Sequence, residues 1–341
     1  MTRPSKIVLD SDPGHDDAIA ILLAHGSPEI DLLAITTVAG NQTLDKTTLN
    51  ALRVATVAGI RGVPIAAGCD RPLLRELVTA AEIHGASGLD GPSFPEPTVA
   101  LERAHASDLI VDLVTASPGE VTLVPTGPLT NVAMALRRQP SLARQVKEVV
   151  LMGGSYTRGN ASPAAEFNIM VDPEAAAIVF EAPWPLTMVG LDLTHQAQAT
   201  PDVTSRIAAV GTPLTEVVLQ MLEFYGRKYR AAELFGHPPV HDPCAVARVI
   251  RPEVVECVDA FVAIETQGRW TSGMTVTEFR ADSGHAFNAR VATKLDIRAF
   301  WDLVVDALVR IGHTLPASTP RDPRISRGPR IGGGGQGEGD G

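Results

Sequence analysis

The sequence predicts an α/β protein, a single domain in which a mainly parallel, mixed β-sheet is flanked by helices. Three observations support this prediction. Short apolar runs alternate with segments of helical spacing along most of the chain, a pattern typical of parallel sheets covered on both faces. Hydrophobic residues make up 45% of the 341 residues, which is enough for a substantial core. No linker divides the chain before residue 314.

The first two thirds of the chain supply the alternating elements. The expected strands are residues 6–12, 31–40, 63–70, 121–127, 146–154 and 185–194. The expected helices are residues 16–25, 45–60 and 105–116, segments that begin at Leu129 and Asp172, and residues 213–235. Strands and helices that alternate at this pace indicate a parallel sheet.

The last third of the chain has a different pattern. Three strand-like stretches follow one another without helices between them, at residues 255–266, 271–280 and 286–295. They predict an antiparallel extension of the sheet. An amphipathic helix over 297–312 closes the domain, which we assign to residues 1–313. Residues 314–341 end in a Gly-rich stretch that cannot bury a core, and they are expected to form a disordered tail.

Composition excludes several classes of protein. Lys and Arg total 29 against 39 Asp and Glu, a net charge of −10, so a nucleic-acid polymer is not an expected partner. No apolar run reaches the roughly 20 residues needed to cross a bilayer, and the first strand begins too early to leave room for a signal peptide. The three cysteines are far apart, which argues against disulfides or a Cys-based zinc site. We therefore expect a soluble, cytoplasmic protein.

The stretch LDSDPGHDDA, residues 9–18, concentrates negative charge at one point of the chain. It contains Asp10, Asp12, Asp16 and Asp17 around a Pro-Gly turn. A helix N-terminus offsets a carboxylate by roughly 0.3–1 kcal/mol, which accounts for one acid but hardly four. Exposure is an incomplete explanation because the flanking residues are apolar. A hard cation bound by carboxylate oxygens resolves the repulsion best, and a capped helix with a solvated acidic turn is the alternative.

Two further segments carry polar residues that suit a binding site. A predicted loop over residues 159–168 contains Asn160, Glu166 and Asn168, whose amides and carboxylate could recognise sugar hydroxyls or could be ordinary loop residues. Asp242, followed by Pro243, could begin a helix as an N-cap or could coordinate a cation. His241 beside it could titrate near neutrality.

The order of elements brings these segments toward one place. Asp12 ends the first strand, Asn41 follows the second, Thr126 ends a later strand, and Gly153 and Gly154 follow another. Ligands of such sheets bind beyond the carboxyl ends of the strands. Residues more than a hundred positions apart could therefore meet in one crevice.

Taken together, these segments make the chain resemble the inosine–uridine nucleoside hydrolase family. The doubled aspartate after Pro-Gly in DSDPGHDDA matches the family's signature. Other matching motifs follow in the expected order: VAGN (38–41), IHGASGLDG (83–91), PTGPLTN (125–131), VLMGG (150–154), AEFN (165–168) and HDP (241–243). The resemblance covers roughly residues 5–312 and implies the nucleoside hydrolase fold with a Rossmann-like core. The Gly-rich tail has no counterpart in it.

The resemblance implies one Ca²⁺ site. Asp12, Asp17 and Asp242 would supply carboxylate oxygens and Thr126 its main-chain carbonyl, with Asp10 as support behind them. Oxygen ligands without a Cys/His cluster independently favour Ca²⁺ over zinc. The residues that the resemblance places around the substrate are Asp16, Asn41, His84, Met152, Asn160, Glu166, Phe167, Asn168, Tyr225, Tyr229, His241 and Asp242.

Among these residues, Asp16, Asn168 and Asp242 would hold the ribose 2′- and 3′-hydroxyls, and Asn160 and Glu166 the 5′-hydroxyl. Asn41 would line the ribose pocket and Met152 would pack beneath the sugar. His84, Tyr225 and Tyr229 are either near the base or part of the core.

The implied activity is hydrolysis of the N-glycosidic bond of ribonucleosides, purine or pyrimidine, to ribose and free base in salvage or catabolism. Asp12 is the expected general base, and His241 is the candidate acid for the leaving base. The resemblance also favours a homodimer or homotetramer.

Two rival classes remain at this stage. A phosphohydrolase of the haloacid-dehalogenase type also opens with a strand ending in Asp-x-Asp, but it needs Gly-Thr where this chain has Pro13-Gly14. A non-catalytic nucleoside- or ribose-binding protein could share the fold, although the presence of Asp12, His241 and Asp242 disfavours it. Release of base from nucleosides, release of phosphate from nucleotides, or one-to-one binding without turnover separates the three.

Overall fold

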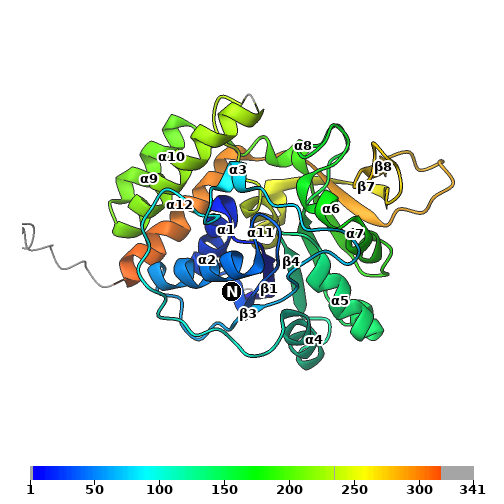
Figure 1. The fold of residues 1–341 in the computed structure, drawn as a ribbon, viewed down its shortest axis with the longest axis horizontal. Coiled ribbons are helices and arrows are strands. Elements are labelled where there is room, and N and C mark those ends of the chain that lie inside the picture. The colour runs from blue at the N-terminus through cyan, green and yellow to red at the C-terminus, as the bar shows by residue number, and fades with distance from the viewer. Residues whose placement is uncertain (1–2, 234, 316–341) are drawn as a thin grey trace, which may run out of the picture.

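The computed structural model describes residues 3–233 and 235–315, and its strands form a nine-stranded sheet (Figure 1). The strand order is β3-β2-β1-β4-β5-β6-β9-β7-β8. The strands are β1 (Ser5–Ser11), β2 (Ile30–Thr37), β3 (Ile65–Ala67), β4 (Val121–Pro125), β5 (Glu148–Met152), β6 (Leu186–Val189), β7 (Val255–Ile264), β8 (Thr275–Glu278) and β9 (Ala289–Leu295). Neighbours from β3 to β9 pair in parallel, whereas β7 pairs antiparallel with β9 and with β8.

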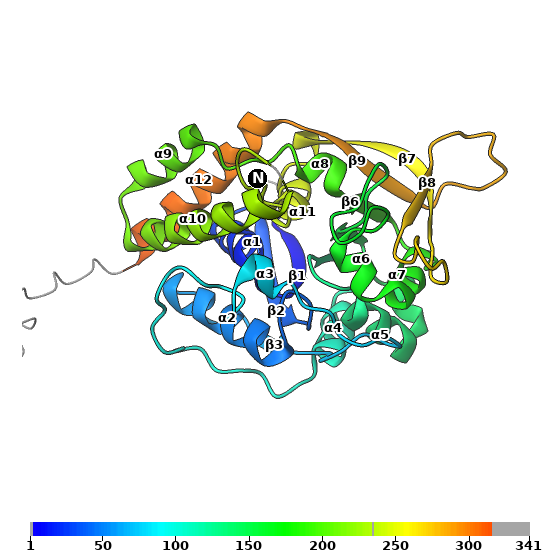
Figure 2. The same ribbon diagram turned by 45° about the horizontal axis from the view of Figure 1, so that its top comes forward.

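Helices flank both faces of this sheet (Figures 1 and 2). They are α1 (His15–Gly26), α2 (Leu44–Val57), α3 (Ala81–His84), α4 (Ala106–Ala116), α5 (Thr130–Arg138), α6 (Phe167–Val171), α7 (Pro173–Phe180), α8 (Leu191–Thr194), α9 (Pro201–Val210), α10 (Pro213–Glu233), α11 (Pro243–Ile250) and α12 (Ile297–Thr314). The predicted fold class, a mixed but mainly parallel sheet between helices, is confirmed.

The alternation of side chains along β1 produces two cores. Successive residues of a strand point to opposite faces, so Ile7 and Leu9 pack in one apolar cluster and Val8 packs in the other. The first cluster contains buried residues of α1, α2 and α9 to α12, and the second contains those of α4, α5 and α7. Since both faces of β1 are buried, its unbroken apolar run is explained.

The structure differs from the predicted elements at several points, of which three concern the site or the domain boundary. The strand expected over 185–194 ends at Val189, and the short helix α8 follows Gly190. The expected loop over 159–168 gives way to α6 at Phe167, because the Glu166 side chain accepts hydrogen bonds from the first amides of that helix. The last helix runs to Thr314, just beyond the proposed domain boundary. Residues 316–341, nearly all of the expected tail, lie outside the described residues.

The sheet has its topological switch point between β1 and β4. From β1 the chain moves outward to β2 and β3, and from β4 it moves outward in the other direction to β5 and β6. Loops that leave neighbouring strands in opposite directions open a crevice at their carboxyl ends. The residues after β1 and β4, which include Asp12 and Thr126, therefore flank this crevice.

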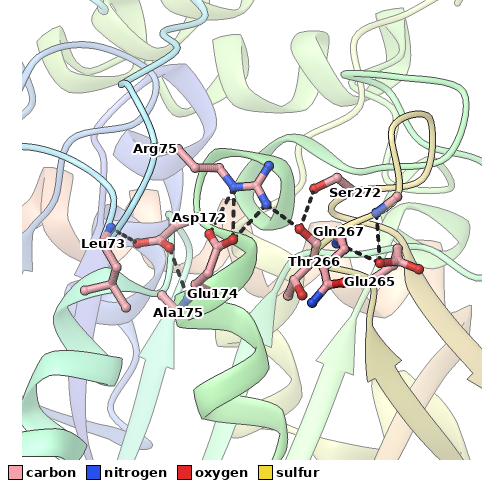
Figure 3. A network of polar contacts seen from close by, with 10 residues as sticks. Leu73, Arg75, Asp172, Glu174, Ala175, Glu265, Thr266, Gln267 and Ser272 are labelled. Atoms are coloured by element: carbon pink, nitrogen blue, oxygen red, sulfur yellow. Dashed lines mark hydrogen bonds and ion pairs between the residues drawn. The ribbon is translucent and has the colours of Figure 1, made fainter.

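A polar network anchors the segment around Leu73 and Arg75 (Figure 3). This rim segment leads to Val78 and Thr79 at the edge of the crevice. The Arg75 guanidinium donates to both carboxylate oxygens of Glu174, with its shortest contact at 2.8 Å, and to the carbonyl of Thr266 at 2.7 Å. The backbone N–H of Leu73 donates to Asp172 Oδ2 at 2.9 Å. The rim segment is thus tied to the start of α7 and to the loop after β7.

None of the described helices is long and apolar enough to cross a membrane.

Candidate active site

A cavity of about 320 Å³ lies beyond the carboxyl ends of β1, β2, β4 and β5. Its walls contain most of the residues predicted from the sequence: Asp16, Asn41, His84, Thr126, Met152, Asn160, Glu166, Phe167, Asn168, Tyr225, His241 and Asp242. Val78 and Thr79, from the anchored rim segment, complete one side. Asp12 and Asp17 are not part of the lining and are fully buried.

The side chain of Tyr229 lies outside the described residues, although its backbone belongs to α10. Its predicted place near the base therefore stays a prediction.

Three buried carboxylates form the tightest acidic group of the site. Asp16, Asp17 and Asp242 each contribute an oxygen, and these oxygens lie within 4.8 Å of one another. The two residues of α1 are 4% and 0% exposed, so the solvated acidic turn weighed above is wrong. Asp242 precedes α11 but makes no side-chain capping bond to it. Its carboxylate is therefore directed to the acidic group rather than to its own helix.

Asp17 links the segments that build the site. Its Oδ1 accepts from Thr126 Oγ1 at 3.1 Å and from the backbone N–H of Asp12 at 3.3 Å. Its Oδ2 accepts from the backbone N–H of Gly14 at 3.0 Å and from Asn41 Nδ2 at 3.1 Å. The loops after β1, β2 and β4 are thus held to one carboxylate, which explains why residues far apart in sequence converge here.

Asp12 lies close to the same group, and only one of its two carboxylate oxygens has a hydrogen-bond partner among the described residues. Its Oδ2 accepts from the backbone N–H of Asn41 at 2.6 Å. Its Oδ1 is buried and has no hydrogen-bond partner among the described residues. Two glycines make room for it, because a Cβ at Gly40 would lie 2.1 Å from Oδ2 and one at Gly127 would lie 2.7 Å from Oδ1.

The electrostatics of the site fit a hard cation. Burial, followed by the charge of Asp17, raises the pKa of Asp16 to about 7. Burial likewise raises the pKa values of Asp12, Asp17 and Asp242. A positive ion would remove the mutual repulsion and satisfy the orphaned Asp12 oxygen. The acidic group can hold a metal ion, and oxygen is its only donor atom.

The predicted ligand set and the observed group overlap but are not identical. Asp17 and Asp242 belong to both, whereas Asp16 is the third member of the tight group in place of Asp12. The main-chain carbonyl of Thr126 accepts a hydrogen bond from Asn168 Nδ2 at 2.8 Å. The same amide donates to the Met152 carbonyl at 3.2 Å, so Asn168 links the carboxyl ends of β4 and β5.

Asn160 and Glu166 hold another part of the cavity wall by accepting hydrogen bonds from backbone N–H groups. Glu166 accepts from the backbone N–H groups of Gly154, Asn168 and Ile169 at 2.9–3.1 Å, and burial raises its pKa to about 7. Asn160 Oδ1 accepts from the backbone N–H of Phe167 at 2.9 Å. Both side chains also line the cavity, so they stabilise its wall and can contact a molecule bound in it.

His241 lines the cavity next to the acidic group. Its backbone N–H donates to Asp16 Oδ2 at 3.1 Å, and its ring Nδ1 lies 2.7 Å from Thr194 Oγ1. Burial, and then the nearby His195, lower the pKa of His241 well below its usual value. The ring is therefore neutral in this pocket, contrary to the expected titration near neutrality.

His84 belongs to a stack of rings on the same side. It stacks on His15 and Tyr225, with centroids 5.3 and 5.4 Å apart, and its Nδ1 lies 3.1 Å from His15 Nδ1. His15 Nε2 donates in turn to the Asp90 carbonyl at 2.8 Å. Burial lowers the pKa of His84 well below its usual value. His84 and Tyr225 are thus both packed in the interior and part of the cavity wall, so the two alternatives are not exclusive.

Sequence reasoning did not identify Thr194 or His15. Thr194 is the last residue of a segment predicted as strand, and nothing in its neighbourhood marks it. His15 stands inside the conspicuous motif DSDPGHDDA, directly before Asp16 and Asp17, and that position was a signal that could have been used.

An α/β fold with buried carboxylates and a histidine in the crevice of its switch point has the arrangement of a candidate enzyme site. The family model for "Inosine-uridine preferring nucleoside hydrolase" matches residues 7–302. The chain belongs to this family, whose members are N-glycosyl hydrolases.

Relatives and solved structures agree with this assignment. The chain is 55% identical to the inosine-uridine preferring nucleoside hydrolase of Crithidia fasciculata over 311 residues, 91% of this chain and 99% of that protein. It is 47% identical to the pyrimidine-specific ribonucleoside hydrolase RihA of Escherichia coli K12 over 304 residues, 89% and 97% of the two chains. The purine-preferring ribonucleoside hydrolase of Gardnerella vaginalis superposes with a TM-score of 0.85 at 31% identity, covering 90% of this chain and 99% of that one.

The geometry around Asp12 predicts the effect of a single added methyl group. In Gly40→Ala the new Cβ would lie 2.1 Å from Asp12 Oδ2 and 2.7 Å from Pro128, so the carboxylate must move. We expect base release from uridine to fall by about 10²-fold, the scale of a displacement near 1 Å in an active site.

Gly236→Ala is the matched control for that change, because its added Cβ meets nothing within 4 Å. Steady-state kinetics and thermal unfolding of both variants provide the measurement. Full activity in Gly40→Ala would show that the position of Asp12 is not critical.

Proposed function

We propose that this protein hydrolyses the N-glycosidic bond of ribonucleosides, releasing ribose and the free base. The observation that carries the proposal is the buried group of Asp16, Asp17 and Asp242, because two of its members line one cavity together with His241. Such a cavity offers both negative charge and an imidazole nitrogen. Membership of a family of N-glycosyl hydrolases supports the same reaction.

The sugar end of the site suits ribose hydroxyls. Hydroxyl groups both donate and accept, and Asp16, Asn168 and Asp242 offer carboxylate and amide groups around the acidic end of the cavity. Asn160 and Glu166 lie in the wall that would receive the 5′-hydroxyl. We assign Asn41 and Met152 to the ribose pocket and Phe167 to the same wall.

We propose Ca²⁺ as the resident metal. Asp12, Asp17, Asp242 and the Thr126 carbonyl are the proposed ligands, and the proximity of Asp16 makes it a further oxygen at the same place. A bound Ca²⁺ would supply positive charge that offsets the carboxylates and would hold oxygen donors of the substrate.

The reaction requires three contributions from the chain. Cleavage builds positive charge on the ribose as an oxocarbenium-like state forms, and the surrounding carboxylates stabilise that charge. Asp12 accepts the proton of the attacking water as general base; its unpaired Oδ1 is the available atom. His241 donates a proton or hydrogen bond to the departing base.

The base range follows from the cavity and the relatives. His84, Tyr225, Tyr229 and His241 are the residues that we assign to the base. Relatives with the same fold are named as purine-preferring and as pyrimidine-specific, so we propose ribonucleosides of both kinds as substrates. Assembly as a homodimer or homotetramer, and location in the cytoplasm, remain predictions from the resemblance.

A panel of nucleosides tests the proposed reaction. Incubation with inosine, uridine, cytidine and adenosine should release free base and reducing sugar in equal amounts from at least one of them. Reaction with 2′-deoxyuridine should be far slower than with uridine, because each buried group that loses a partner costs roughly 1–3 kcal/mol. Release of phosphate from nucleotides without base release, or equal rates on the two uridines, would contradict the proposal.

Metal binding tests the acidic group. The purified protein should bind about one Ca²⁺ per chain by calorimetry, and Asp12→Ala should lose both the metal and the activity because Asp12 is a proposed ligand and the proposed general base. Asp192→Asn is the control, since Asp192 bonds to Tyr156 and Thr157 outside the cavity. A normal Ca²⁺ content and turnover in Asp12→Ala would overturn the assignment.

Leaving-group dependence tests the role of His241. In His241→Ala, turnover of inosine or uridine should fall by roughly 10²–10⁴-fold, the usual contribution of a positioned acid. Turnover of p-nitrophenyl riboside should change little, because p-nitrophenolate departs without a proton. Equal losses on both substrates would mean that His241 shapes the pocket rather than assisting the leaving base.

A further inference from the structure

Thr194 is the partner of His241 at the end of the short helix α8. Its Oγ1 lies 2.7 Å from His241 Nδ1, and the Thr194 residue is 0% exposed. The helix follows β6 directly through Gly190, where an added Cβ would lie 2.8 Å from the carbonyl of Gly154. The close packing at Gly190 fixes where α8 begins and therefore where the Thr194 hydroxyl lies.

The backbone of His241 is fixed separately from its ring. The backbone N–H donates to Asp16 Oδ2 at 3.1 Å, and Asp242 follows immediately. Rotation about the last side-chain bond could nevertheless exchange the ring nitrogens with ring carbons at the cavity wall. The contact with Thr194 selects one orientation, because it holds Nδ1 at 2.7 Å.

The buried hydroxyl also bears on which nitrogen carries the proton. Thr194 Oγ1 is close enough to His241 Nδ1 for a hydrogen bond, in which the donor depends on the tautomer of the ring. A buried O–H group needs an acceptor for its hydrogen, and Nδ1 can accept it. If Thr194 donates to Nδ1, the single proton of a neutral imidazole resides on Nε2. His241 also lines the cavity, and Nε2 is the ring nitrogen that Thr194 does not contact.

We propose that Thr194 is a positioning residue that holds His241 in its Nε2–H tautomer, with this proton directed at the departing base. This inference rests on the proposed function, because the departing base is the group that receives the hydrogen bond. As the C1′–N bond breaks, its electron pair stays with the base nitrogen, and the hydrogen bond from Nε2–H stabilises the negative charge that develops on the base. The departing base then takes its proton from water, and His241 keeps its own.

The first test is spectroscopic and needs no activity. In protein labelled with ¹⁵N-histidine, the His241 signals, identified by their loss in His241→Gln, should show the Nε2–H tautomer. Thr194→Val should convert them to a mixture of tautomers, and Thr194→Ser should restore the single form. An Nδ1–H tautomer in the native protein, or no change in Thr194→Val, would overturn the proposal even if nucleosides proved not to be substrates.

The second test uses the leaving group. Thr194→Val should lower kcat for uridine by about 10–10²-fold, the usual effect of removing a group that orients a catalytic side chain, with a smaller change in KM. The ratio of uridine to p-nitrophenyl riboside turnover should fall by the same factor, and Thr194→Ser should recover it. Adding Thr194→Val to His241→Ala should cause no further loss.

Equal losses on the two substrates, or a further loss in the double variant, would show that Thr194 only supports the local fold. Absence of base release by the native protein would instead contradict the proposed function, and the tautomer measurement would still decide the role of Thr194.

Discussion

The mutual repulsion of buried carboxylates at the switch point of the sheet is the constraint on which the rest of the structure depends. Asp12, Asp16, Asp17 and Asp242 are each at most 4% exposed. Backbone N–H groups at two helix starts donate to these carboxylates. Gly14 lies before α1, and His241 lies before α11. Helix N-termini favour negative charge, but by less than the burial of four acids requires. A bound cation would supply the positive charge that the protein itself does not place beside these carboxylates.

The same constraint links the two ends of the cavity. Asp242 and His241 are adjacent in sequence, and the backbone N–H of His241 is bonded to Asp16. Any shift of the acidic group is transmitted to the histidine one residue away. The sugar and the base of a nucleoside are likewise joined by a single bond, so the spacing of the two chemical functions is built into one short segment. Thr194 then adds an independent restraint from helix α8, which follows β6.

Local chemistry explains why much of the site could be predicted from the sequence. The Pro-Gly turn between two pairs of aspartates, and the polar residues that follow buried strands, mark the crevice without knowledge of the fold. The contacts of Thr194, His15 and Arg75 could not be predicted in this way. Each joins segments whose proximity depends on strand order and on exact helix starts, and the helix α8 replaced residues that looked like strand.

The prominence of Asp16 in the acidic group has a similar cause. Adjacent helix residues diverge by about 100°, which by itself would direct Asp16 and Asp17 to different places. The start of α11 brings Asp242 close to both side chains, so that the three carboxylates form one group.

The anchoring of the rim by Arg75 bears on the shape of the cavity. Arg75 fixes one end of the segment, and the backbone N–H of Ala80 donates to the Asn41 carbonyl at 3.1 Å and fixes the other. The span over residues 76–79 is too short to swing aside while both ends hold. The part of the cavity wall that Val78 and Thr79 form therefore keeps its place as long as both anchors hold. The ion pair of Arg75 and Glu174 thereby couples the shape of the cavity to the local stability of the fold.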